Sequence, residues 1–409
     1  MDADALCRAV DRLHPEQRDF LAELVRIPSD NPPGDCAGPA ERAASLLRRL
    51  GFAVELHPVP DPIVRANGMV SVTNLVIRHR IGPGPVIALN AHGDVVPPGD
   101  GWTVDPYGAV IRDGVMYGRG VAVSKSDVAT YAFALKALIE TGAAHAGTVE
   151  LHFTYDEEAG GLLGPGFLLK EGIVKPDYAI CAGFSYGVVI AHNGCLHLEV
   201  SVKGRSAHAA EPDNGADALA AATVMLTSLY ALRDELRSVR SRVPGITHPT
   251  LVVGLIKGGI NTNVVPDLVT LRLDRRIIPE ESPDEVEQAL VRHIEQVGRS
   301  LPGIEVTVRP ILRAAPLRSN AKQATLTTAL QTHARAVLGE DIPAHGVPLY
   351  TDARHYAEAG IPTVLYGAGP RTLLEANGHR ADEKLVLEDL RKATRIVALT
   401  LADLLSGKG

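Results

Sequence analysis

The chain has 409 residues and a formal net charge of −7, with 45% hydrophobic and 22% charged residues. This length predicts two domains, and the composition is that of a folded rather than a disordered protein. The acidic balance and the scatter of basic residues give no electrostatic basis for binding nucleic acid or an anionic membrane. No apolar run reaches the roughly 18 residues of a membrane span.

The N-terminal stretch MDADALCRAVDRLHPEQ lacks the basic-then-apolar plan of a secretory signal and indicates the start of an amphipathic helix. The cysteines contain no C-x-x-C pair and are scattered along the chain, at Cys7, Cys36, Cys181 and Cys195. Such spacing is typical of reduced thiols. We therefore expect a soluble, cytoplasmic protein.

The first part of the chain alternates strand patterns with helix patterns. The apolar run 86–91 fits a buried strand that ends at His92, and 128–140 has helical spacing without a breaker. The segment 148–155 alternates as a strand and runs directly into three acidic residues. This order predicts an α/β sheet covered on both faces, with reactive groups just past the carboxyl ends of strands.

The pattern changes near residue 196. Three strand patterns follow, at 196–204, 250–259 and 268–277, together with two helix patterns, at 217–232 and 282–297. Two helices with a few antiparallel strands predict a small α+β unit. The alternation of strand and helix patterns resumes near residue 312. We therefore predict a domain at 196–311 that is inserted into a catalytic domain made of 1–195 and 312–409.

His92-Gly93-Asp94 is the first candidate for catalytic chemistry. A metal-ligating histidine usually donates its second ring N–H to an acceptor, and Asp94 can serve His92 in that way. The plain alternative is a histidine satisfied by its neighbours at the end of a strand.

Glu157 and Glu158 follow a buried strand directly. Adjacent carboxylates are costly to desolvate there, and a bound cation relieves that cost. Because neighbouring side chains diverge, one can ligate a metal while the other acts as a general base toward water. The alternative is a solvated acidic turn. His379, in the polar loop EANGHRADE, is a third candidate, with an ordinary surface histidine as its alternative.

These motifs, taken in order, resemble the family of metal-dependent amidohydrolases and exopeptidases that includes aminoacylase, carboxypeptidase G, acetylornithine deacetylase and succinyl-diaminopimelate desuccinylase. The resemblance spans nearly the whole chain. It rests on HGD (92–94), YGRG (117–120), FTYDEEAGG (153–161), GRSAHAAEPDNGADAL (204–219), GGINTNVVPD (258–267), LDRRIIPEE (273–281), TDARHYAEAGIPTVLYGAG (351–369) and GHRADE (378–383). It implies a zinc-exopeptidase-like α/β catalytic domain and an inserted α+β lid and dimerisation domain, and hence a homodimer.

The resemblance also implies roles for the matching residues. His92, Glu158 and His379 would be metal ligands. Asp94 would orient His92, and Glu157 would be the general base.

Three residues of the inserted domain match further positions. His208 resembles the residue that reaches across the family's dimer to stabilise an oxyanion. Asn263 and Arg276 resemble the polar residues that meet the substrate's carbonyl and carboxylate. The alternatives are that His208 caps a turn and that Arg276 is one more ion-paired strand residue beside Asp274.

Two positions depart from the family pattern. The family carries two metals bridged by a carboxylate just after GRG, and Val123 stands at that position here. The carboxylate expected after the strand pattern 178–183 falls at Gly183. The two histidines and one glutamate that remain are the ligand set of a mononuclear zinc site with an open fourth position.

Ligand relocation is the alternative to a single metal. Asp127 lies one helical turn after Val123 and shares its face, so it is a further candidate ligand. Cys181 and His192 flank the Gly183 region as weaker candidates.

The chain is therefore expected to hydrolyse an amide-type C–N bond in a small carboxylate-bearing substrate, such as an N-acyl amino acid, a dipeptide or an aromatic conjugate. It would use one divalent ion per subunit, zinc, manganese or cobalt. The altered metal site leaves room for hydrolytic deamination of an aromatic amino acid-like substrate. A non-catalytic binding protein on the same fold is a further alternative, which the retained glutamate pair and histidines oppose.

Overall fold

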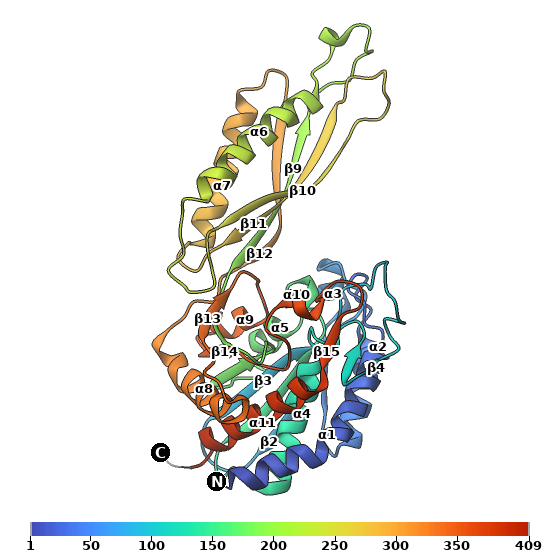
Figure 1. Cartoon of the computed structure of the whole chain (residues 1–409). Helices are drawn as coiled ribbons and strands as arrows, with labels where there is room; N and C mark the ends of the chain where they lie inside the picture. The colour runs from blue at the N-terminus through green and yellow to red at the C-terminus, as the bar shows by residue number, and fades with distance from the viewer. Residues whose placement is uncertain (1, 408–409) are drawn as a thin grey trace. The chain divides into compact units, whose positions relative to one another are not determined.

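The computed structural model describes residues 2–407, which divide into two compact units (Figure 1). The first unit comprises the described residues up to Ile190, Ser319–His345, and the described residues from Thr351 onward. The second comprises Ala191–Arg318 and Gly346–Tyr350. No helix within residues 2–407 combines the length and the apolar character that a bilayer crossing requires.

The first unit is built on an eight-stranded sheet in the order β1-β2-β6-β3-β7-β14-β8-β13. Its strands are β1 (Glu55–Pro58), β2 (Thr73–Arg80), β3 (Val86–His92), β6 (Thr148–Thr154), β7 (Tyr178–Cys181), β8 (Val188–His192), β13 (Ala344–Val347) and β14 (Thr363–Leu365). Strands β6, β3, β7 and β14 run parallel, so their carboxyl ends meet at one edge of the sheet. A separate three-stranded sheet contains β4 (Val110–Arg112), β5 (Val115–Tyr117) and β15 (Lys384–Val386).

Helices cover both faces of the large sheet. The helices of this unit are α1 (Ala3–Val25), α2 (Ala37–Arg49), α3 (Asp61–Ala66), α4 (Lys125–Thr141), α5 (Pro165–Lys170), α8 (Ala324–Leu338), α9 (Ala353–Glu358), α10 (Leu373–Ala376) and α11 (Leu387–Leu404). Leu75 and Ile77 of β2 join the main core, which includes α1, α4 and α11. Val76 between them packs with Leu168 of α5 in a separate cluster. Since successive strand residues point to opposite faces, both faces are covered, and the predicted α/β class is confirmed.

The second unit is an α+β structure with its own core. Its antiparallel sheet has the order β10-β11-β9-β12. The elements are β9 (Gly194–Lys203), α6 (Ala218–Leu236), β10 (Thr250–Gly258), β11 (Leu268–Ile277), α7 (Pro283–Arg299) and β12 (Glu305–Ala314). Leu196, Leu198 and Val200 of β9 pack with residues of α6 and α7. The alternate residues Cys195 and His197 therefore lie on the sheet face turned away from the helices.

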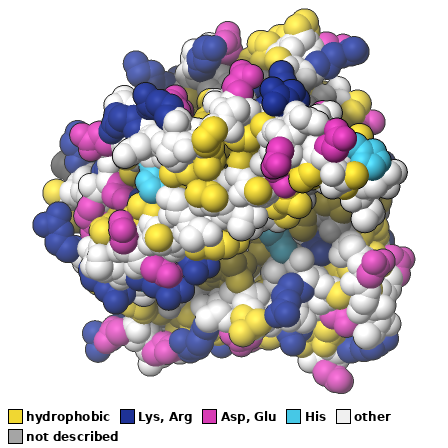
Figure 2. Space-filling view, turned by 90° about the horizontal axis from the view of Figure 1, so that it is seen from above, with side chains coloured by type: hydrophobic (Ala, Val, Ile, Leu, Met, Phe, Trp, Pro, Cys, Tyr) yellow, Lys and Arg dark blue, Asp and Glu magenta, His cyan; other side chains and the backbone are white. Residues whose placement is uncertain are grey.

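Charged side chains of both signs are mixed over the face of the molecule shown in Figure 2. This mixing agrees with the modest net charge of −7. A surface of interspersed charges produces no extended field of one sign.

Candidate functional site

Two neighbouring parallel strands bring the candidate catalytic residues together. His92 is the last residue of β3 and lies opposite Thr154 in the ladder between β3 and β6. Glu157 and Glu158 come just after β6, in the short 3₁₀ turn η1 (Glu157–Ala159). Because the two strands are parallel, these groups meet at one edge of the sheet, where α/β folds place their ligands.

The side-chain atoms of this group form a compact cluster. One potential ligand atom from each of His92, Glu157 and Glu158 lies within 4.8 Å of the other two. The Nε2 atom of His379 is 3.1 Å from Oε1 of Glu158. His379 has a left-handed backbone, with φ of 61°, which a non-glycine residue adopts at a cost of about 1 kcal/mol. Strain of this kind is concentrated at functional sites.

Asp94 connects the histidine to the glutamate pair. Its carboxylate accepts hydrogen bonds from the backbone N–H groups of Glu157 and Glu158, each at 3.2 Å, and from Nδ2 of Asn31 at 3.0 Å. The Nδ1 atom of His92 lies 3.0 Å from the backbone oxygen of Asp94 and 3.4 Å from its Oδ1 atom. The predicted orienting residue therefore also fixes the turn that presents both glutamates.

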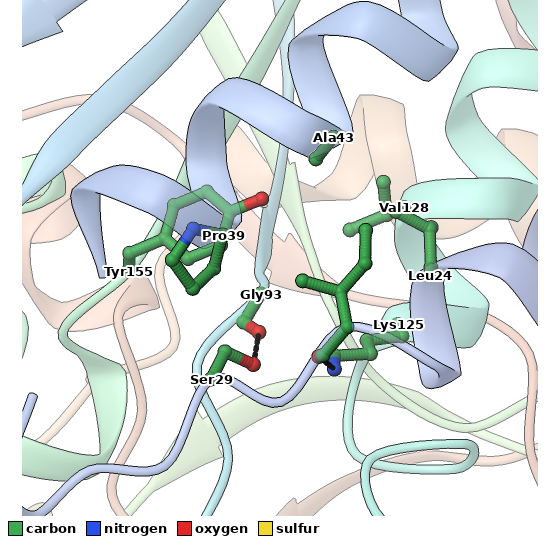
Figure 3. A pocket seen from close by; sticks show the side chains of 9 residues that line it. Leu24, Ser29, Pro39, Ala43, Gly93, Lys125, Val128 and Tyr155 are labelled. Carbon is green, nitrogen blue, oxygen red and sulfur yellow. Dashed lines mark hydrogen bonds between the residues drawn. The ribbon is translucent and has the colours of Figure 1, made fainter. Parts of the chain in front are cut away.

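Gly93 lines a small, mostly apolar pocket next to the turn (Figure 3). A Cβ atom at Gly93 would lie 2.4 Å from the ring of Tyr155, so only glycine fits there. The backbone oxygen of Gly93 accepts a hydrogen bond from Oγ of Ser29 at 2.6 Å. Lys125 lines the same pocket and donates to the backbone oxygen of Ile27 at 2.7 Å. Burial lowers the pKa of Lys125 to about 8, and the residue supports the loop beneath the cluster.

The charges of the cluster act on one another. Burial raises the pKa of the Glu157 carboxyl well above its ordinary value; His92 opposes this shift, and Glu158 adds to it. Burial by itself would lower the pKa of His92, but the carboxylates of Glu157 and Asp94 raise it well above its ordinary value. A buried carboxyl with a raised pKa is suited to carrying a proton.

Glu383 ties the His379 loop to the loop that contains Val123. Its Oε1 atom accepts hydrogen bonds from the backbone N–H groups of Ala122 and Val123, at 3.0 and 3.1 Å. Its Oε2 atom pairs with Nη1 of Arg119 at 2.6 Å, and both side chains are buried. No local sequence pattern indicates a role for Glu383, although this residue closes the GHRADE motif.

The two positions without ligand side chains differ in how closely they are packed. Val123 is partly buried against the main core, and a Cβ atom on Gly378 would lie 3.5 Å from its Cγ2 atom. A Cβ atom at Gly183 would lie 2.9 Å from the backbone nitrogen of Tyr366. The backbone therefore leaves no room for a carboxylate side chain at residue 183.

Asp127 directs its carboxylate at backbone groups. Its Oδ1 atom accepts a hydrogen bond from Ala368 N at 2.6 Å, and its Oδ2 atom accepts one from Gly183 N at 3.2 Å. Burial raises the pKa of Asp127 to about 8, although the two backbone hydrogen bonds oppose the shift. In this arrangement the carboxylate joins the segments that follow β7 and β14.

The TDARH stretch at the start of α9 supports the glutamate turn from another side. Nη2 of Arg354 donates to the backbone oxygen of Gly160 at 2.5 Å, and Nε2 of His355 lies 3.1 Å from the same oxygen. Asp352 is buried and accepts from Oγ1 of Thr154 at 3.2 Å. The residues of this motif have no role that the sequence alone indicates, because no local pattern shows which loop they contact.

His208 and Asn263 lie in adjacent loops of the second unit. The backbone N–H of Ala209 donates to the backbone oxygen of Asn263 at 3.0 Å. Nδ1 of His208 accepts a hydrogen bond from the N–H of Ala210 at 3.1 Å. Both His208 and Asn263 are exposed.

Arg276 lies elsewhere in the second unit, near the end of β11. Its Nε and Nη2 atoms contact the carboxylate of Asp274 at 2.9 and 3.1 Å. Its guanidinium carbon lies 5.5 Å from the centre of the Tyr350 ring. Arg276 is therefore ion-paired in this structure, as the alternative to a substrate-binding role described.

The architecture and the cluster have counterparts among known proteins. The model of peptidase family M20/M25/M40 matches residues 88–403. The chain belongs to this family. An uncharacterized metallohydrolase of Methanococcus maripaludis is 24% identical over 403 residues, covering 91% of this chain and 96% of the relative. Succinyl-diaminopimelate desuccinylase of Rhodospirillum centenum is 27% identical over 403 residues, covering 95% and 97%.

The fold also matches solved structures. The dipeptidase Dug1p of Saccharomyces cerevisiae superposes with a TM-score of 0.82 at 17% identity, covering 100% of this chain and 99% of that one. This likeness confirms the zinc-exopeptidase-like fold. With the family match, it identifies the chain as a metal-dependent hydrolase that acts on amide or peptide C–N bonds, and the family implies a divalent metal cofactor.

Proposed function

We propose that the chain hydrolyses an amide bond in a small substrate that carries a carboxylate, such as an N-acyl amino acid, a dipeptide or an aromatic conjugate. One divalent ion would be held by His92, Glu158 and His379. The observation that carries this proposal is the cluster at the ends of β3 and β6, in which two carboxylates and a histidine converge within 4.8 Å.

The donor set fits such an ion. Two imidazoles and one carboxylate match a zinc site with an open position, and manganese or cobalt can use the same donors. The ion-pair contact of 3.1 Å between His379 and Glu158 shows that the two side chains already face each other. A divalent ion at this place polarises a carbonyl group and lowers the pKa of water.

Glu157 is the proposed general base. It lies beside the proposed ligands, with its Oε2 atom 3.8 Å from Nε2 of His92. It would take a proton from the attacking water and later give that proton to the leaving amine. Its buried setting favours the protonated form that the second step requires.

A single ion is proposed because neither residue 123 nor residue 183 supplies the carboxylate that the family pattern has there. Val123 has no lone pair, and residue 183 has no room for a side chain. Both oxygens of Asp127 are engaged by backbone N–H groups. Asp127 is therefore proposed as a structural residue of the site and not as a ligand.

His208 is proposed to donate a hydrogen bond to the oxyanion in the active site of a partner subunit. Because Nδ1 accepts from Ala210, the proton of the neutral ring is carried by Nε2, which can act as a donor. A donor of this kind stabilises the developing negative charge on the carbonyl oxygen. Asn263 would assist at the carbonyl, and Arg276 would bind the substrate carboxylate.

The second unit is proposed as a lid and dimerisation domain. Its edge strand β10 exposes Val252, Leu255 and Ile256, and α6 exposes Leu219 and Val224. Exposed apolar side chains on an edge strand and an adjacent helix are typical of a surface that another chain covers. The proposed assembly is a homodimer.

A reducing, cytoplasmic location completes the proposal. The four cysteines, all in the described part of the chain, form no disulfide. Their state fits a compartment that keeps thiols reduced.

The proposal is tested with matched substrates. Purified protein loaded with zinc or manganese is assayed on N-acyl amino acids and dipeptides, and on the same compounds with the terminal carboxylate converted to an amide. Hydrolysis of the carboxylates that is lost in Glu157→Gln and is much weaker on the amides supports it. An equal rate on both series would contradict the carboxylate preference, and no hydrolysis in either series would contradict the substrate class.

A further inference from the structure

The second unit contains a group of potential metal ligands outside the site described above. Cys195 and His197 lie two residues apart on β9 and therefore project from the same face of the sheet. Asp274 lies opposite His197 on the neighbouring strand β11. All three are on the face that α6 and α7 leave uncovered, because the alternate residues of β9 form the helix-covered core.

The three side chains already stand at ligand spacing. The Sγ atom of Cys195 is 3.9 Å from Oδ1 of Asp274, and Nε2 of His197 is 3.1 Å from Oδ2. One ligand atom from each residue lies within 4.8 Å of the other two. A tetrahedral ion with bonds of about 2.0 to 2.3 Å separates its ligand atoms by about 3.3 to 3.8 Å, so only small side-chain movements are needed.

We propose that Cys195, His197 and Asp274 form a second metal site, for a thiol-binding divalent ion such as zinc. The set contains one sulfur, one nitrogen and one oxygen donor, which suits zinc or cobalt and disfavours manganese or magnesium. Cys195 is fully buried, whereas the side chains of His197 and Asp274 are 32% and 31% exposed. The ion would therefore enter from the solvent side, from which water could supply a fourth ligand.

Arg276 is the competitor for this site. Its guanidinium group holds the carboxylate of Asp274 through two contacts, at 2.9 and 3.1 Å. An incoming ion takes over that carboxylate, and Arg276 keeps its contact with the ring of Tyr350. Ion binding at Cys195 therefore competes with the pairing of Arg276 and Asp274, and each weakens the other.

The test uses cobalt(II) as the probe, added to the full-length protein after chelator treatment. A cobalt–thiolate bond gives a strong near-ultraviolet charge-transfer band, which the thiolate-free cluster at His92 cannot produce. The expected result is such a band in the wild type and in Glu158→Gln, and its loss in Cys195→Ser. Absence of the band in the wild type, or its persistence in Cys195→Ser, would overturn the proposal.

Two further variants guard against misfolding of Cys195→Ser. His197→Gln changes a partly exposed side chain. It is expected to raise the cobalt dissociation constant, measured from the charge-transfer band, by at least about tenfold. Arg276→Gln removes the competing charge and is expected to lower the cobalt dissociation constant by about tenfold or more. No change in either variant would contradict the assignment. Hydrolytic activity is not part of this readout, so failure of the proposed function leaves the test intact.

Discussion

The Oδ2 atom of Asp94 accepts a hydrogen bond from the backbone N–H of Glu158 at 3.2 Å. The aspartate that ends the H-G-D motif thus sets the position of the proposed metal ligand in the turn that follows β6. It also accepts from the N–H of Glu157 through Oδ1, at 3.2 Å. One buried carboxylate therefore aligns the proposed base and the proposed ligand together.

Asp94→Asn is expected to weaken both metal affinity and activity. The asparagine amide places an N–H donor against one of the two backbone N–H groups, so the glutamate turn shifts. Residues that orient metal ligands typically contribute 10- to 100-fold, and a loss of about that size is expected in metal affinity. Competition with a chromogenic chelator measures it. Asn31→Ala, which removes only a neighbour of Asp94, is the control and should have a smaller effect.

Val123→Asp is expected to create a place for a second ion. The new carboxylate would stand where the family pattern has its bridging ligand, beside the loop of His379. The zinc content, measured by mass spectrometry in a Cys195→Ser background, should rise from one ion per subunit to two. Gly183→Asp is the matched control: its Cβ atom would lie 2.9 Å from Tyr366 N, so it should destabilise the fold and add no ion. An unchanged zinc content in Val123→Asp would show that the missing carboxylate does not limit metal number.

Asp127→Asn is expected to retain the full metal content, because Asp127 contacts backbone amides. Burial raises its pKa from 3.8 to about 8, so the folded state holds this proton more tightly than the unfolded state. Between about pH 4 and pH 8 the wild type therefore loses stability as the pH rises. The variant lacks this titrating group, so its free energy of unfolding relative to that of the wild type should increase as the pH rises from about 4 to about 8. Urea unfolding at several pH values measures the difference, and loss of the metal would instead identify Asp127 as a ligand.

Glu383→Gln is expected to destabilise the protein strongly. The change leaves the buried guanidinium group of Arg119 without its charged partner, and breaking a buried pair in this way costs about 3–5 kcal/mol. Arg119 also lies 5.3 Å from the ring of Trp102, a contact that does not replace the carboxylate. Chemical denaturation gives the free energy of unfolding. The double variant Arg119→Met/Glu383→Met should recover part of the lost stability. An unchanged free energy of unfolding in Glu383→Gln would contradict the role of Glu383 in joining the two loops.

The sequence predicted the elements that carry strong periodicity. The strand pattern 86–91 corresponds to β3 and 268–277 to β11, and the helix pattern 128–140 lies inside α4. These segments are recognisable because hydrophobic spacing is a local property of the chain. The meeting of His92 with the glutamate pair also followed from a general rule about parallel strands.

The contacts that the sequence could not predict are long-range ones. Glu383 bonds to the backbone of Ala122 and Val123, and Arg354 to that of Gly160. Backbone amides leave no mark in the sequence, so no pattern identifies which carboxylate they will meet. Likewise, the direction of Asp127 depends on where the segments after β7 and β14 place Gly183 and Ala368.

Whether the active site holds a single ion is measured by the zinc content per subunit of Cys195→Ser after loading with excess zinc and removal of weakly bound metal. We expect one zinc per subunit, reduced to none when His379→Ala is added. Two ions per subunit, both lost with Glu158→Gln, would contradict it and require a relocated ligand. No bound zinc would contradict the metal assignment of His92, Glu158 and His379 altogether.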